Sequence, residues 1–181
     1  PWIGEKTAAK LAFFLLKANT TYVANFAKAL SDLHEKVREC DVCHAMTDID
    51  HPTCSICSDV RRDNTLLCVV EDYLDMLSID RTWVFRGRYH VLGGVISPIQ
   101  WTTPDKLNYD SLFARILENP EISEIILAMN PNIEGEATAL YAIWHMPREV
   151  RISRLSKWLP HAGSIEYADE ITLLSAFRGR G

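Results

Sequence analysis

The chain has 181 residues, of which 48% are hydrophobic and 24% charged, so it can bury a core as one domain or two small ones. No apolar run approaches the roughly 20 residues that cross a bilayer, which excludes a membrane-spanning helix and leads us to expect a cytoplasmic protein with reduced thiols. The net charge of −5 argues against DNA binding over the whole surface. Residues 1–30, however, hold four lysines and one glutamate, so a phosphate-binding surface is expected there.

The first predicted element is a helix over residues 5–16, where apolar residues recur at the spacing of one helical face. At about 100° per residue, Lys6, Lys10 and Lys17 fall within roughly 40° of one another on the opposite face. Spacing alone favours a solvated helix face. A turn at Gly4 that leads into a basic helix is also how backbone N–H groups meet a phosphate, so DNA contact is the competing interpretation.

A second helix is predicted from Asn19 or Thr20, either of which can cap it, to about Val37. Its apolar residues again repeat at helical spacing. The two helices therefore form a predicted helical region that precedes the cysteines.

Two C-x-x-C motifs follow, with ten residues between them. Two residues between cysteines let one tight turn aim both sulfurs at one ion, and four thiolates close the tetrahedral site of a structural zinc. Two disulfides are the alternative, but they need an oxidising compartment, which nothing else in the sequence indicates. Four thiolates leave no ligand position for His44 or His51. We predict one structural Zn²⁺ ion held by Cys40, Cys43, Cys54 and Cys57.

From residue 66 onward, short apolar runs of strand type alternate with helical patterns. Cys68 lies in the first run and is expected to be a small buried side chain, not a nucleophile. The alternation predicts an α/β fold with a mostly parallel sheet covered on both faces. Strands are predicted at 66–70, 89–92, 124–129 and 150–155, and helices at 73–78, 111–118 (capped by Asp110), 134–145 and 169–177.

Acidic and amide residues follow two of these strands, at the edge where a parallel sheet collects ligands. Glu71 and Glu134 could hold Mg²⁺ there for phosphoryl-transfer chemistry, or Glu134 could only favour the positive N-terminus of its helix. For Glu136, a favourable interaction with the positive N-terminus of the helix is the better explanation. Amides at Asn130 and Asn132 bring no negative charge, so we predict weak or no Mg²⁺ binding and no catalysis.

The ordered set of motifs resembles the RecR family of bacterial recombination mediators. Residues 1–8 are similar to the remnant of a helix-hairpin-helix, residues 67–71 to the opening of a Toprim domain, residues 126–138 to its second motif, and 163–173 to the family's tail. The resemblance covers essentially the whole chain. It implies a helical region at 1–38, a zinc finger at 39–60, a Toprim-like domain at 61–155 and an oligomerisation tail at 156–181.

The resemblance implies a non-enzymatic, nucleoid-associated protein of DNA repair. Family members form dimeric or tetrameric rings that contact DNA, and they act with RecO and RecF to help RecA replace single-strand-binding protein on gapped DNA. The implied DNA contacts are Lys6 and Lys10, with Lys17 on the same face. The implied partner contacts are Glu71, Glu134 and Glu136, beside Asn130.

Two other functions compete with this one. A Toprim enzyme that cuts or joins phosphodiesters with Mg²⁺ would use Glu71 and its neighbours. A protein-interaction scaffold with little DNA affinity would fit the net charge of the chain.

Several residues depart from the family pattern. The resemblance leads us to expect glycine where Trp2, Trp83, Trp101 and Trp158 stand, and threonine at Met129. Glycine permits a positive φ and a close approach to phosphate, whereas tryptophan permits neither cheaply, so Trp2 weakens the case for a hairpin contact with DNA. Burial at subunit contacts is an alternative role for the tryptophans. Natural divergence and engineering are both open as origins.

Overall fold

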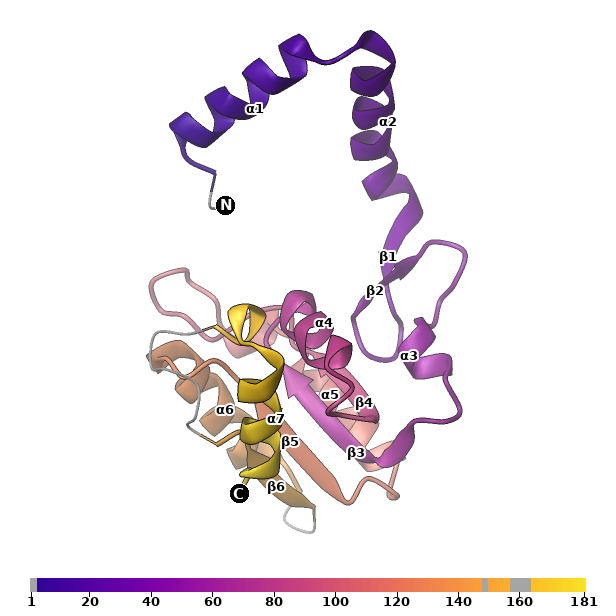
Figure 1. The fold of residues 1–181 in the computed structure, drawn as a ribbon. Helices are drawn as coiled ribbons and strands as arrows, with labels where there is room; N and C mark the ends of the chain where they lie inside the picture. The colour runs from indigo at the N-terminus through magenta and orange to yellow at the C-terminus, as the bar shows by residue number, and fades with distance from the viewer. Residues whose placement is uncertain (1–2, 148–149, 157–163) are drawn as a thin grey trace.

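The computed structural model describes residues 3–147, 150–156 and 164–181; Trp2 and Trp158 lie outside them. Two helices, α1 (Glu5–Lys17) and α2 (Thr20–Lys36), come first, and together they are called the arm. The Asn19 side chain accepts a hydrogen bond from the Tyr22 amide at 2.8 Å, which caps α2. Neither helix of the arm has a buried residue, and Figure 1 shows both extending away from the rest of the chain.

The cysteine segment folds around a small antiparallel hairpin of β1 (Val37–Glu39) and β2 (Met46–Asp48), followed by a single helical turn, α3 (Ser55–Ser58). Strands of three residues are too short to show a reliable alternation of apolar and polar side chains, so sequence analysis does not find this hairpin. The hairpin begins directly after the last residue of α2, and the first cysteine pair lies in the turn that joins β1 to β2.

The remaining chain forms a four-stranded parallel sheet in the order β4-β3-β5-β6, which confirms the predicted α/β fold class. Its strands are β3 (Asp63–Val70), β4 (Gly87–Val91), β5 (Glu124–Ala128) and β6 (Arg151–Arg154). The helices between and after them are α4 (Tyr73–Arg81), α5 (Tyr109–Glu118), α6 (Ile133–His145) and α7 (Glu170–Arg178), with short 3-10 turns η1 (Pro104–Lys106) and η2 (Ile165–Tyr167).

The sheet separates two apolar cores, as expected for strands that are buried on both faces. Alternate residues of β3 point to opposite sides: Cys68 and Val70 to one core, Leu67 and Val69 to the other. Helices α4 and α7 cover the first core and α5 and α6 cover the second (Figure 1). Cys68 is fully buried, and burial raises the pKa of its thiol, in agreement with the expectation of an inert side chain.

Helix α5 begins earlier than predicted: its N-cap is Asn108, not Asp110. The Asn108 side chain donates to the Val91 carbonyl at 3.1 Å, and its own carbonyl accepts from His90 Nε2 at 2.9 Å. Tyr109, the first helical residue, is buried and donates through its hydroxyl to the Thr138 carbonyl at 2.7 Å. These long-range contacts start the helix at residue 109, and local sequence does not reveal them.

Candidate functional site

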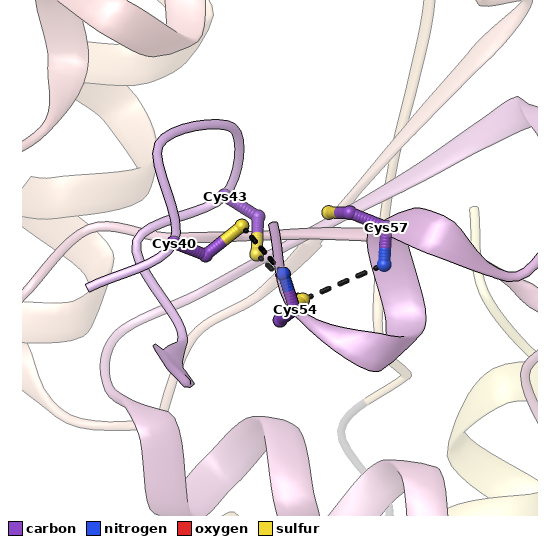
Figure 2. A group of neighbouring side chains, drawn as sticks. All are labelled: Cys40, Cys43, Cys54 and Cys57. Carbon is purple, nitrogen blue, oxygen red and sulfur yellow. Dashed lines mark hydrogen bonds between the residues drawn. The ribbon is translucent and has the colours of Figure 1, made fainter. Parts of the chain in front are cut away.

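The four cysteines converge, although they come from two separate turns (Figure 2). Their four sulfurs lie within 4.8 Å of one another, and the sulfurs of Cys43 and Cys54 are 3.5 Å apart. Three of the four side chains are buried, and the fourth, Cys57, is partly buried. Four enclosed thiols are the ligand set of a closed tetrahedral metal site, which leaves no coordination position for a substrate.

Backbone hydrogen bonds to sulfur join the two turns and shape the second one. The amides of Cys54 and Cys57 donate to the sulfurs of Cys40 and Cys54 at 3.3 Å and 3.4 Å, which favours negative charge on the cluster. The pKa of the Cys54 thiol is lowered, chiefly because the Cys43 thiol hydrogen-bonds to its sulfur. The same hydrogen bond raises the pKa of the Cys43 thiol, and the pKa of the Cys57 thiol is raised to about 12, so these contacts favour the metal-binding thiolate form at Cys54 and the neutral thiol at these two neighbours.

The neighbouring histidines lie outside the cluster. His44 Nε2 lies 2.8 Å from the Ser111 hydroxyl on α5, and its Nδ1 lies 3.2 Å from Glu39 on β1. The Val91 amide donates to the Cys43 carbonyl at 2.8 Å. His44 and the turn beside it therefore join the cysteine segment to the sheet and α5, while His51 is exposed.

The predicted DNA-contacting lysines lie on one exposed helix. Lys6, Lys10 and Lys17 are all solvent-exposed residues of α1. Within the described ranges none of the three forms a salt bridge, whereas Lys36 on α2 pairs with Asp32 at 2.6 Å. The three ammonium groups are therefore free to meet an anion from solution.

The acidic and amide residues meet at the carboxyl edge of the sheet, as predicted, and are called the acidic edge: Glu71, Asn130, Glu134 and Glu136. Glu71 is buried, and both of its oxygens accept hydrogen bonds from Asn130, one from the backbone amide at 2.6 Å and one from the side chain at 2.7 Å. Burial raises the pKa of Glu71, and these two bonds oppose that rise. Asn130 in turn accepts from the Ile165 amide at 2.8 Å.

The other members of the acidic edge have different partners. Glu134 accepts a hydrogen bond from the Ser97 hydroxyl, and Glu136 forms a salt bridge with Arg154 at 2.8 Å. Asn132 caps α6 by accepting from the Gly135 amide at 2.7 Å. In the described part of the chain the cysteines form the sole candidate metal group, so the acidic edge does not assemble three convergent ligands.

Sequence analysis misses one carboxylate of this region, Asp75. It lies in the first turn of α4, where Asp72 caps the helix by accepting from the Leu74 and Asp75 amides. Asp75 is only 2% exposed, its Oδ2 has no hydrogen-bond partner, and burial raises its pKa to about 8. Its place three residues after a capping aspartate is ordinary for an acid at a helix start, so no local signal marks it as buried.

Two comparisons with known proteins show the family to which this chain belongs. Residues 65–156 match the family model of the Toprim domain, and residues 163–180 match the model described as RecR, C-terminal. Proteins called Recombination protein RecR are 45% identical in Myxococcus xanthus, 47% in a Nocardioides species and 48% in Thermobifida fusca. Each alignment covers 99% of this chain and 89–90% of the relative. Within the described residues, no helix is long and apolar enough to cross a bilayer. The chain belongs to the RecR family.

Proposed function

We propose that this protein is a non-catalytic, DNA-binding mediator of recombination that acts with RecO and RecF to promote RecA loading on gapped DNA coated by single-strand-binding protein. Family membership supports the role in recombination. The observation that carries the DNA-binding part is the row Lys6, Lys10 and Lys17 on α1, which is exposed and forms no salt bridge with any described residue, in a chain with a net charge of −5. These exposed cations on one helix of the arm offer contacts for DNA phosphates in a chain that is acidic as a whole.

Binding through this row depends on counterion release. Three lysine–phosphate contacts on single-stranded DNA predict a slope of log K against log[salt] of about −2. We expect the double variant Lys6→Gln/Lys10→Gln to reduce the steepness of that slope by about 1.4. The measurement is a salt titration of DNA affinity by fluorescence anisotropy.

A matched control tests whether position matters and not net charge alone. Arg178 is an exposed cation at the end of α7, so Arg178→Glu makes the same charge change as Lys10→Glu far from α1 in sequence. We expect Lys10→Glu to weaken binding at least several-fold more than Arg178→Glu. Equal effects, or an affinity that does not change with salt, would reject the lysine row as the DNA contact.

We propose that the cysteine cluster holds one structural zinc ion. Zn–S bonds of about 2.3 Å place the sulfurs of a tetrahedral site roughly 3.8 Å apart, close to the 3.5 Å between Cys43 and Cys54. The ion would join the turn after β1 to α3 in a segment too small to hold itself by core burial. It would set the orientation of the arm relative to the sheet and take no part in a reaction.

We also propose that the arm contributes to a homodimer or homotetramer. Both helices of the arm are amphipathic, yet none of their residues is buried, and an apolar surface of this extent is typical of an interaction site. We favour a second copy of the chain as the partner that covers this apolar surface, because it presents the same surface in return. The exposed apolar side chains of the arm include Leu11, Phe13, Phe14, Leu16, Phe26, Leu30 and Leu33.

Native mass spectrometry tests the assembly. Leu16→Lys on α1 should shift the protein toward monomer, whereas Leu117→Lys, an equally exposed leucine on α5, should leave the assembly unchanged. A wild-type monomer at micromolar concentration would reject the ring.

The division of the chain at residues 38, 60 and 155 stays a prediction that limited proteolysis of the assembled protein can check.

We assign contact with RecO to the acidic edge, because Glu134 and Glu136 lie at the open end of the sheet, where loops present side chains to ligands. Asn130 engages both oxygens of Glu71, which supports a non-catalytic role. Glu134→Lys should weaken capture of RecO while the affinity for DNA stays the same. Nicking of DNA that requires Mg²⁺ and is lost in Glu71→Gln would instead favour the enzyme.

A further inference from the structure

Two of the tryptophans have an unusual backbone conformation. In the described ranges a positive φ is adopted by two glycines and three other residues, and Trp83 (φ 56°) and Trp101 (φ 55°) are two of those three. Non-glycine residues adopt a positive φ in only a few per cent of cases, so finding it by chance in two of the three described tryptophans is an event on the order of one in a few hundred. The third, Trp144, lies in helix α6.

Trp83 occupies the position that ends helix α4. Thr82 is the C-cap, and the Trp83 amide donates to the Asp80 carbonyl at 3.1 Å. The residue just beyond a C-cap commonly adopts the left-handed conformation, and glycine is the usual residue there. Trp83 is 64% exposed, and the Arg86 guanidinium lies over its indole ring, 4.4 Å from the ring centroid. Helix termination, and not burial of the ring, therefore accounts for the backbone conformation.

Trp101 closes a tight loop. The amides and carbonyls of Ser97 and Thr102 exchange hydrogen bonds of 3.0 Å and 2.9 Å, with four residues between them. Trp101 is the last of those four. It is 81% exposed, and its backbone carbonyl accepts from Lys106 Nζ at 2.8 Å. Any residue can offer that carbonyl. The loop thus requires a positive φ at position 101 and makes no use of the indole.

We infer that positions 83 and 101 are glycine in the protein as its own cells make it. The tryptophans would then come from one codon that the source organism reads as glycine. UGA differs by one base from a tryptophan codon and by one base from a glycine codon, so a single reassigned tRNA would account for both positions. It would also account for Trp2 and Trp158, where glycine is expected from sequence.

Composition supports the inference independently of geometry. The chain has 8 glycines in 181 residues, roughly 4%, against a usual share of about 7%. Glycine at all four positions would raise the share to roughly the usual value. The shortfall of glycine in the chain is therefore about equal to the number of tryptophans at positions where glycine is expected.

The inference changes the surface beside the acidic edge. The loop that Trp101 closes also carries Ser97, whose hydroxyl donates to Glu134. An indole at position 101 adds a second large exposed apolar group beside Ile99, whereas glycine leaves Ile99 as the loop's one large exposed apolar side chain. Partner binding at the acidic edge should therefore be measured with Trp101→Gly as well as with the unsubstituted chain.

Peptide mass spectrometry of the protein isolated from its own cells tests the inference directly. We expect the peptides that span positions 83 and 101 to carry glycine at both. Tryptophan at either position overturns the inference. This outcome is independent of DNA binding, so it leaves the proposed function untouched.

The backbone argument has its own test with the recombinant chain. Trp83→Gly and Trp101→Gly should each raise the midpoint of thermal unfolding by roughly 2–4 °C, because each removes a left-handed tryptophan. The matched control is Trp144→Gly, which should lower the midpoint because Trp144 is a helical residue in the last turn of α6 and glycine has a lower helix propensity than tryptophan. No rise for either loop variant would show that these positions do not require glycine, and would overturn the inference.

Discussion

The cysteine cluster and the acidic edge both bring possible metal ligands together from distant parts of the chain, but they use them differently. In the cluster the four sulfurs face one another, and the amides that donate to them belong to the cluster itself: one bond crosses between the two turns and one lies within the second turn. At the acidic edge the carboxylates have separate partners: Asn130 for Glu71, Ser97 for Glu134 and Arg154 for Glu136. Proximity of ligand-type residues is therefore not sufficient for a metal site, because the donors must also face one another and not be held apart by separate partners.

The largest effect is expected from breaking the cluster. Cys40→Ser should abolish zinc binding and lower the free energy of unfolding by more than about 3 kcal/mol, because zinc binding contributes directly to the folding of so small a segment. Zinc content and chemical denaturation measure both effects. Cys68→Ala, a buried cysteine outside the cluster, should keep the zinc. A Cys40→Ser protein that folds and assembles normally without metal would contradict the structural role.

The acidic edge can be altered toward a metal site by a single substitution. Asn130→Asp places a second carboxylate against buried Glu71 and removes a donor, so the free energy of unfolding should fall by roughly 3 kcal/mol at pH 7. Added Mg²⁺ should recover part of that loss. Asn132→Asp is the matched control, because aspartate caps a helix as well as asparagine does and the effect should be small. Equal losses in the two variants would show that Asn130 has no special role.

Asp75 provides a test that depends on pH. Its pKa is about 8 in the folded protein and near 3.8 when unfolded, so the folded state binds more protons between these values. The free energy of unfolding should therefore fall as pH rises from about 4 to 8, by up to about 1.4 kcal/mol for each pH unit, because one proton is released on unfolding. Asp75→Asn should remove this slope. An unchanged slope in the variant would show that Asp75 is not the group that titrates.

The smallest effect is expected at His44. His44→Ala should retain one zinc per chain, because His44 is not among the converging donors. It should lose roughly 1 kcal/mol of stability with the hydrogen bond to Ser111. Loss of zinc from this variant would make His44 part of the metal site after all.

Sequence analysis predicts the α/β class and the order of strands and helices, and the cysteine spacing predicts the cluster, because these features depend on patterns that are local in the chain. It misplaces the start of α5, since Asn108 and Tyr109 are held by contacts with β4 and α6. It misses the burial of Asp75 for the same reason. It also predicts the apolar stripes of the arm without showing that a single chain leaves them exposed.

The most direct test is to measure the metal content of the purified protein by elemental analysis together with a Mg²⁺ titration. The account predicts one zinc per chain, lost in Cys40→Ser, and no stabilisation of the wild type by millimolar Mg²⁺. A protein that folds without zinc, or a wild type that Mg²⁺ stabilises through Glu71, would contradict the distinction between the cluster and the acidic edge.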